Sequence, residues 1–154
     1  MAARTVVGTI SSATLAISAT LPATYDAAGY GATTITYTTI GEVENFGNHG
    51  VTATITEFTP ISTATVAKVK GSKNYGTMAL MLGSIPSDAG QVILAAAAES
   101  NAHYSAKLTY PDNEIHYLDV IVAKDEYQDG AVNDVMKRSV DLAICRAPVI
   151  VAAA

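Results

Sequence analysis

The fold class of this chain is decided by one stretch, HYSAKLTYPDNEIHYLDVIVA, at residues 103–123. In residues 103–110 polar and apolar side chains alternate without a break, with the apolar residues at even positions. A period of two predicts a half-buried β-strand. Residues 111–114 read PDNE, which is typical of a turn, and residues 115–123 return as a second apolar-rich strand. The stretch therefore predicts an antiparallel β-hairpin.

Strands are also expected on both sides of this hairpin. Five segments have a strand-like pattern: Thr34–Thr38, Val51–Thr56, Val66–Lys70, Tyr75–Leu82 and Met136–Cys145. Of these, Val66–Lys70 and Tyr75–Leu82 are expected to flank a turn at residues 71–74. Sixteen threonines lie in the first 65 residues, and a β-branched side chain with a hydroxyl suits a strand face that meets solvent or a polar interface. The chain is therefore predicted to be mainly β.

One α-helix is predicted, at about residues 88–100. Asp88 and Gln91 have the spacing of a capping box at its start. The segment Val92–Glu99 follows with four consecutive alanines, which are the best helix formers. Asn101 suits a helix C-cap. A helix with so much alanine can pack very close to a sheet or to a neighbouring subunit.

The charged fraction of the chain is low, at 15% against about 25% in a typical soluble domain. Nearly half of the residues, 49%, are hydrophobic, yet no apolar run approaches the roughly 18 residues that span a bilayer. Such a chain stays in solution with a surface of neutral polar groups, or it buries much of its surface against other subunits. The threonines support a neutral polar surface, and we expect burial against other subunits as well.

The charge distribution argues against a protein that grips nucleic acid. The formal net charge is −5, and there is no Lys or Arg between Arg4 and Lys68. Affinity for phosphates comes from clustered basic residues. A role in tight nucleic-acid binding is therefore disfavoured.

The length fits one domain, residues 1–154, with a core of its own. Residues 1–21 carry no charge after Arg4 and are expected to form an extended N-terminal arm or edge strand. Residues 148–154, which begin at Pro148, are expected to form a C-terminal arm. Thr and Ser residues break the apolar run that a secretory signal would need. We therefore expect synthesis in the cytoplasm.

The strongest catalytic hypothesis is a thiol site made of Cys145, His116 and Asp119. A nucleophilic cysteine must be accessible and lie in electropositive surroundings. Cys145 instead follows an apolar strand-like run, which is typical of an inert core residue. We expect that the chain is not an enzyme.

Cofactor and metal sites are not indicated either. The three histidines, His49, His103 and His116, lack the short spacing of a zinc motif and are expected at the surface. Residues 29–31, GYG, lack the third glycine of a dinucleotide-binding loop and are expected to form a turn. The acidic residues of Lys124–Asp134, expected to be a loop, do not keep EF-hand spacing. We therefore expect no cofactor and no metal.

Several short segments, taken in order, resemble the major tail tube protein of long, non-contractile bacteriophage tails. They are Tyr25–Tyr30, Ile40–Val43, Lys70–Gly71, Ser87–Gln91 and Arg138–Leu142 before Pro148. Together they cover about residues 22–150. The resemblance implies two packed β-sheets, a sandwich or barrel, with the helix at about 88–100 on its flank.

The resemblance also implies how copies assemble. Six subunits would close a ring in which one sheet of each joins a continuous inner β-barrel. Rings would stack through a long loop, here Gly41–Pro60, and through the two arms. The residues expected at the subunit interface are Glu42, Glu44, Asn45, Phe46, Asn48 and His49.

The function implied is structural: a subunit of the virion tail, in a hollow conduit for viral DNA. Its expected partners are copies of itself and the tape measure, tail tip and tail terminator proteins. DNA would pass without specific binding, and no membrane would be involved. Lys68, Lys70 and Lys73 are expected on the outer surface or paired with acids of a neighbouring subunit.

Two other structural classes share threonine-rich strands and self-assembly. A phage head decoration or connector protein is one of them. A fimbrial-type subunit is the other, although it should carry an export signal and often a disulfide, and a single cysteine forms no internal disulfide.

Overall fold

A computed structural model of the chain describes residues 4–153. Its ten strands and two helices follow the order β1 (Thr14–Ser18), α1 (Ala27–Tyr30), β2 (Thr38–Thr39), β3 (Val43–Asn45), β4 (Thr52–Phe58), β5 (Ala67–Asn74), β6 (Thr77–Gly83), α2 (Ala89–Glu99), β7 (Tyr104–Thr109), β8 (Ile115–Gln128), β9 (Lys137–Ile144) and β10 (Val149–Val151). The prediction of a mainly β fold with one flanking helix is confirmed. Neither described helix is long and apolar enough to cross a membrane.

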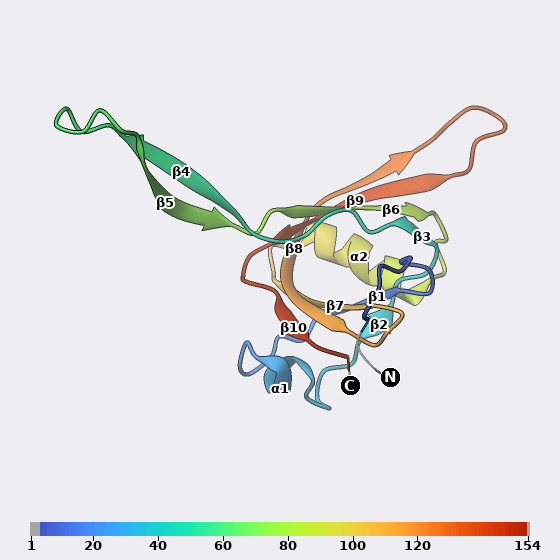
Figure 1. Ribbon diagram of the computed structural model, residues 1–154. Coiled ribbons are helices and arrows are strands. Elements are labelled where there is room, and N and C mark those ends of the chain that lie inside the picture. The colour runs from blue at the N-terminus through green and yellow to red at the C-terminus, as the bar shows by residue number, and fades with distance from the viewer. Residues whose placement is uncertain (1–3, 154) are drawn as a thin grey trace.

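Eight strands form one curled sheet with neighbours in the order β2-β1-β7-β8-β9-β6-β3, while β10 pairs with β8. The two ends of this path, β2 and β3, are joined by only three residues of chain. Ile40 N donates to Leu15 O of β1 at 2.8 Å, and Gly83 N at the end of β6 donates to Glu42 O at 2.8 Å. We call residues 38–45 the seam, because they connect the two ends of the sheet and give it the form of a half-barrel (Figure 1).

The core lies between the curled sheet and α2, which the sheet surrounds (Figure 1). Leu94 and Ala97 of α2 are fully buried, and the helix contacts β8, β1 and β2. The sheet contributes buried apolar residues to the same cluster: Leu15, Ile17, Met78, Leu80, Leu82, Ala106, Leu108, Leu118, Val120, Val122, Val140, Leu142 and Ile144. The alternating pattern of residues 103–123 thus directs one face of β7 and β8 into this cluster.

The start of α2 is joined to the seam by hydrogen bonds. One carboxylate oxygen of Asp88, Oδ2, accepts from Gln91 N at 3.0 Å, as the capping box predicts, and from Gly41 N at 3.1 Å. The buried Gln91 amide donates to the carbonyls of Gly41 at 3.2 Å and Gly83 at 2.8 Å. Its oxygen accepts from Ile85 N at 3.0 Å. Helix, seam and β6 are therefore held together by one side chain.

Two antiparallel pairs of strands extend beyond the body. The first, β4 with β5, forms a separate two-stranded sheet; we call residues 51–74 the hairpin. The second is the far end of β8 and β9, where Gln128 is opposite Lys137; we call residues 127–136 the ribbon tip. In Figure 1 the hairpin leaves the body toward the upper left and the ribbon tip toward the upper right.

Several local predictions are confirmed. The hairpin expected at residues 103–123 is β7 and β8, with Leu108 opposite His116 across the pair. The helix at about 88–100 is α2, although its C-cap is Ser100 and not Asn101. The strand expected over Met136–Cys145 is β9.

Other local predictions are wrong. Of the strand expected at Thr34–Thr38, only Thr38 is paired, and Gly29–Tyr30 belong to the short helix α1 instead of a turn. Residues 71–74 are not a turn but lie within β5, because β5 pairs with β4 and not with β6. The start of the expected acidic loop, up to Gln128, continues strand β8.

The predicted arms are partly integrated into the body. Residues 14–18, expected in the N-terminal arm, form β1, which lies between β2 and β7 with Leu15 and Ile17 buried. Residues 149–151, expected in the C-terminal arm, form β10 on β8. The exposed part of the N-terminal segment that the structure describes is therefore residues 4–12.

Replacing Gln91 by Ala should destabilise the fold by roughly 2–4 kcal/mol, because two buried carbonyls and one buried N–H lose their partner. The loss should appear as a lower urea concentration at the midpoint of unfolding of the unassembled monomer. Gln128→Ala, the same substitution at an exposed position, is the matched control and should change stability by less than about 0.5 kcal/mol. Equal stability of the two variants would contradict this role of Gln91.

Candidate subunit interface

The predicted interface residues lie in and directly after the seam. Glu42 adopts a positive φ of 58° at the corner between β2 and β3. The Glu44 carboxylate forms an ion pair with Lys137 Nζ of β9 at 2.7 Å. Asn45 Oδ1 accepts from Gly47 N at 2.7 Å. Glu44 and Asn45 are therefore anchored within the subunit, and all three side chains are largely exposed.

Phe46 and Asn48 differ in their surroundings. Phe46 is partly buried and packs against the core cluster of its own subunit, whereas Asn48 is exposed. The segment expected to be a long loop, Gly41–Pro60, is therefore not one loop. Its first half belongs to the body, and only its second half, which contains β4, projects as one strand of the hairpin. A contact of these residues with another copy stays a prediction.

His49 ends the predicted set and forms part of a chain of polar groups. Its Nε2 lies 2.8 Å from Nδ1 of His116 on β8, and Nε2 of His116 lies 2.7 Å from a carboxylate oxygen of Glu114. The Tyr110 ring stands edge-on to His116, with ring centroids 4.8 Å apart. Burial, and next the nearby His116 ring, lower the pKa of His49. This pair of rings fastens the base of the hairpin to β8.

Glycines stand at both ends of the hairpin. Gly50, before β4, has a φ of +152°, and Gly76, after β5, has a φ of +77°. Residues that carry a side chain rarely adopt such backbone angles. No atom lies close enough to either glycine to contact an added Cβ. The chain therefore turns into and out of the hairpin at two unhindered glycines.

The hairpin itself is the surface that sequence reasoning missed. Almost all of its residues are exposed on both faces, and they include large apolar side chains: Val51, Ile55, Phe58, Ile61, Val66 and Val69. A single two-stranded hairpin is at best marginally stable in water. A contiguous exposed apolar surface marks an interaction site. The sequence signal was the strand-like run Val66–Lys70, whose continuation through residue 74 was hidden by Gly71 and Ser72.

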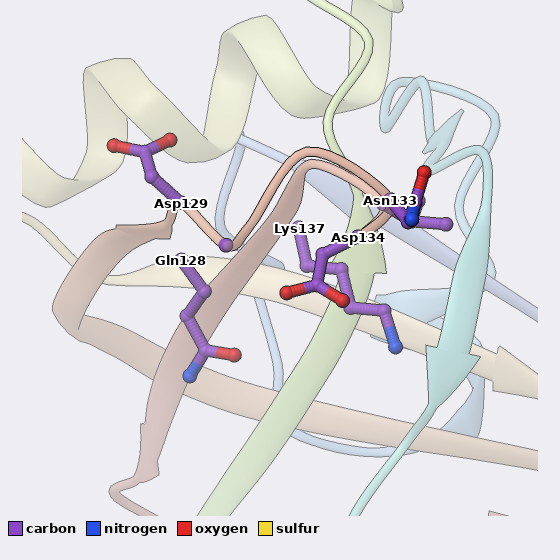
Figure 2. Close-up of a pocket in the computed structure, with 7 residues that line it drawn as sticks. Gln128, Asp129, Asn133, Asp134 and Lys137 are labelled. Carbon is purple, nitrogen blue, oxygen red and sulfur yellow. The ribbon is translucent and has the colours of Figure 1, made fainter.

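The ribbon tip is supported by a buried ion pair. Arg138 and Asp125, from β9 and β8, form a bidentate contact in which the guanidinium is almost fully buried. The Arg138 guanidinium also lies over the Tyr127 ring, 5.3 Å from its centroid. Beyond this pair the ribbon forms a pocket lined by polar residues, of which Gln128, Asp129, Asn133, Asp134 and Lys137 are labelled in Figure 2.

The structure does not assemble the hypothetical thiol site. Cys145 is exposed, so its prediction as a core residue is wrong. Partial desolvation by the surrounding atoms, and next the Asp119 carboxylate, still raise the pKa of Cys145, which makes the thiolate scarcer. The Asp119 carboxylate is bonded to His103 at 2.9 Å and to Arg146 at 3.0 Å. His116 faces Glu114 and His49 instead. In residues 4–153 no three His, Cys, Asp or Glu side chains are grouped to hold a metal ion.

One family of known proteins matches this chain. The model of one family, described as phage tail tube protein (TTP), matches residues 2–153. No curated protein matches the sequence at a significant level.

Solved structures share the fold at low sequence identity. A chain of the anti-feeding prophage (AFP) baseplate superposes with a TM-score of 0.71 at 9% identity, covering 97% of this chain and 99% of that one. For the SPP1 tail tube the TM-score is 0.60 at 14% identity, with 91% and 76% covered. For the PVC sheath/tube terminator it is 0.61 at 9% identity, with 96% and 98% covered. At such identities the similarity shows the fold alone.

The histidine pair predicts how stability depends on pH. Because the pKa of His49 is lowered on folding, the folded chain binds fewer protons than the unfolded chain below the ordinary histidine pKa of about 6.5. The free energy of unfolding should therefore be greatest above about pH 6.5 and fall as the pH drops through the lowered pKa. Urea unfolding at a series of pH values measures this.

His49→Gln should remove that part of the decline. His103→Gln is the matched control, because it leaves the His49–His116 pair in place and should keep the decline. A wild-type free energy of unfolding that is constant from about pH 7 to 5 would show that the pKa of His49 is not lowered on folding.

Proposed function

The chain belongs to the phage tail tube protein family, and from this membership we propose that six copies close into a ring and that rings stack into a hollow conduit for viral DNA. The chain is a structural subunit of a phage tail tube. A ring of six subunits is supported by the fold that this chain shares with a chain of the AFP baseplate, which is a 6-fold symmetrised assembly. No catalytic role is proposed for it.

The observation that carries this proposal is the hairpin. It extends from the body as two strands with exposed apolar residues, such as Phe58 and Val69, which are 65% and 60% exposed. Burying apolar surface away from water is favourable by about 25 cal/mol per Å². Other copies of the chain can supply the surface that covers these residues. The hairpin, with the exposed side chains of Glu42, Glu44, Asn45 and Asn48 nearby, supports a contact between subunits.

The charge of the chain suits a passage for DNA. Each copy carries a formal charge of −5, and residues 5–67 contain no Lys or Arg. A ring of basic groups would release counterions from passing phosphates and hold the DNA in a salt-dependent way. A lumen of neutral polar and acidic groups lets DNA slide. We propose that Lys68, Lys70 and Lys73 face away from this lumen.

The remaining partners follow from the family. We propose that the tape measure protein lies inside the tube and that tail tip and tail terminator proteins contact its two ends. The exposed N-terminal residues before β1 and the residues around Pro148 would add contacts between rings. The subunit would be made in the host cytoplasm and act in the virion tail.

Purified protein should form hollow tubes with six-fold symmetry, visible by negative-stain electron microscopy. The expectation rests on the exposed hairpin and the low charge of the chain, which leave the monomer with apolar surface that only association covers. Sedimentation measures the fraction assembled as concentration rises. A protein that stays monomeric at every concentration reached, with neither rings nor tubes, would sink this proposal.

Replacing both Phe58 and Val69 by Ser should prevent tube formation and leave the monomer folded. Both side chains are exposed, so the free energy of unfolding should change by less than about 0.5 kcal/mol per substitution. Val92→Ser on α2 removes an apolar side chain of similar exposure, 53%, and should still give tubes. Normal tubes from the hairpin variant would show that its apolar residues are not part of a subunit contact.

A further inference from the structure

The register of β4 and β5 gives the hairpin two different faces. Side chains directly opposite each other in an antiparallel pair lie on the same face. Phe58 is opposite Ala67, and Thr56 is opposite Val69, which makes one face mainly apolar. The other face is charged, since Ile55 is opposite Lys70 and Glu57 is opposite Lys68.

The charged face of the hairpin is basic. Its two strands hold three lysines, Lys68, Lys70 and Lys73, against a single acid, Glu57. Lys68 is 3.5 Å from the Glu57 carboxylate, in an exposed pair that is worth little. Within residues 4–153, Lys70 and Lys73 have no ion-pair partner. The hairpin therefore presents a positive charge and an apolar face that no part of residues 4–153 covers.

The ribbon tip has the complementary properties. It carries the acids Asp129 and Asp134, and Glu126 directly precedes it. Its exposed apolar side chains are Tyr127, Val132, Val135 and Met136. Of the basic residues near it, Lys137 is bonded to Glu44 at 2.7 Å, and Lys124 lies 3.8 Å from a carboxylate oxygen of Glu126, in an exposed pair that is worth little. Asp129 has no ion-pair partner among the residues described. In Figure 2 the Asp129 and Asp134 carboxylates lie on the tip.

These two surfaces do not meet within one subunit. In Figure 1 the hairpin and the ribbon tip point away from each other on opposite sides of the body. A surface that fits a different surface on the next copy makes a head-to-tail contact, and such contacts repeat around a ring when the rotation closes. The separation of the two surfaces therefore favours contact between copies of the chain.

We propose that the hairpin of one copy docks on the ribbon tip of a neighbouring copy of this chain. Ile55, which lies on the same face as the lysines and is exposed, packs against the apolar side chains of the tip, and Lys70 and Lys73 face Asp129 and Glu126. The apolar contact supplies the attraction, and the opposite charges set the orientation and exclude the reverse pairing of two hairpins or two tips. This inference rests on the proposed assembly into rings.

A charge exchange tests the contact. Lys70→Glu with Lys73→Glu should raise the concentration for half-assembly roughly tenfold or more, because like charges then face each other. Asp129→Lys with Glu126→Lys should do the same. The four substitutions in one chain restore opposite charges and should return assembly to near the wild-type concentration. Glu99→Lys, an exposed acid on α2, controls for a general effect of charge and should assemble normally.

The outcomes separate this inference from the proposed function. If the wild type forms tubes and the combined variant is not restored, or if the separate reversals assemble normally, the docking is overturned while the tube remains. If the wild type does not assemble at all, both proposals fail. Thermal unfolding of each monomer shows whether a loss of assembly is a loss of folding.

Disulfide capture gives a second measurement that needs no charge reversal. In a Cys145→Ser background, which removes the only native thiol, Lys70→Cys with Asp129→Cys should link copies into a ladder of covalent oligomers under mild oxidation. Lys70→Cys with Glu99→Cys is the matched control and should give no ladder. Equal ladders from both pairs, or none from the first in assembled tubes, would count against the docking.

Discussion

The structure depends on the satisfied polar groups around the buried amide of Gln91. The seam brings the Gly41 carbonyl into the interior, and β6 ends there with the Gly83 carbonyl. Buried carbonyls without a partner are costly. One side chain bonds both carbonyls and also the Ile85 N–H, while the Asp88 carboxylate bonds Gly41 N. The sheet can curl around α2 because the helix start supplies partners for the backbone at the point of closure.

A buried carboxylate, that of Asp119, attaches the later part of the chain to the sheet. Asp119 is 1% exposed on β8 and bonds His103 before β7 and Arg146 after β9. The Arg146 guanidinium in turn lies 3.9 Å from the centroid of the Tyr25 ring. A buried carboxylate needs such partners, and here they come from two separate parts of the chain, while Tyr25 from a third part packs on Arg146. With the body closed in this way, the surfaces left over for association are the extended strands and the exposed ends of the chain.

Sequence reasoning succeeded where the signals were local. The pair β7–β8 has unbroken alternation around a turn sequence, and α2 has its cap in Asp88 and Gln91, so both were predictable from adjacent residues. It failed where distant pairing decided the structure. Gly71 and Ser72 have the composition of a turn, but pairing with β4 keeps them in β5. The contact between His49 and His116 spans 67 positions, and no spacing rule points to it. Cys145 follows the alternation of β9 but falls after its last residue, Ile144, and is exposed.

The position of the predicted interface shows the same limit. The resemblance pointed to the region after β2, and that region does lead into the hairpin. The part that projects, however, begins only at about residue 51, because Glu44 and Phe46 have partners in the body. Which residues of a segment remain exposed depends on the closure of the sheet, and closure is not visible in residues 41–60 alone.

The two glycines at the ends of the hairpin have a mechanical consequence. Gly50 and Gly76 stand at the two feet of the hairpin with room for a change in backbone angle, while the His49–His116 pair and the bond from Ile144 N to Gly76 O hold the adjoining chain to the body. An arm with such joints can tilt as a unit by a limited angle while its own cross-strand hydrogen bonds stay intact. Small differences in the angle between adjacent subunits can then be absorbed at the joints, without separating the surfaces at the end of the arm. In the proposed assembly, such joints would combine contact between subunits with compliance, so that the tube could curve and recover its shape.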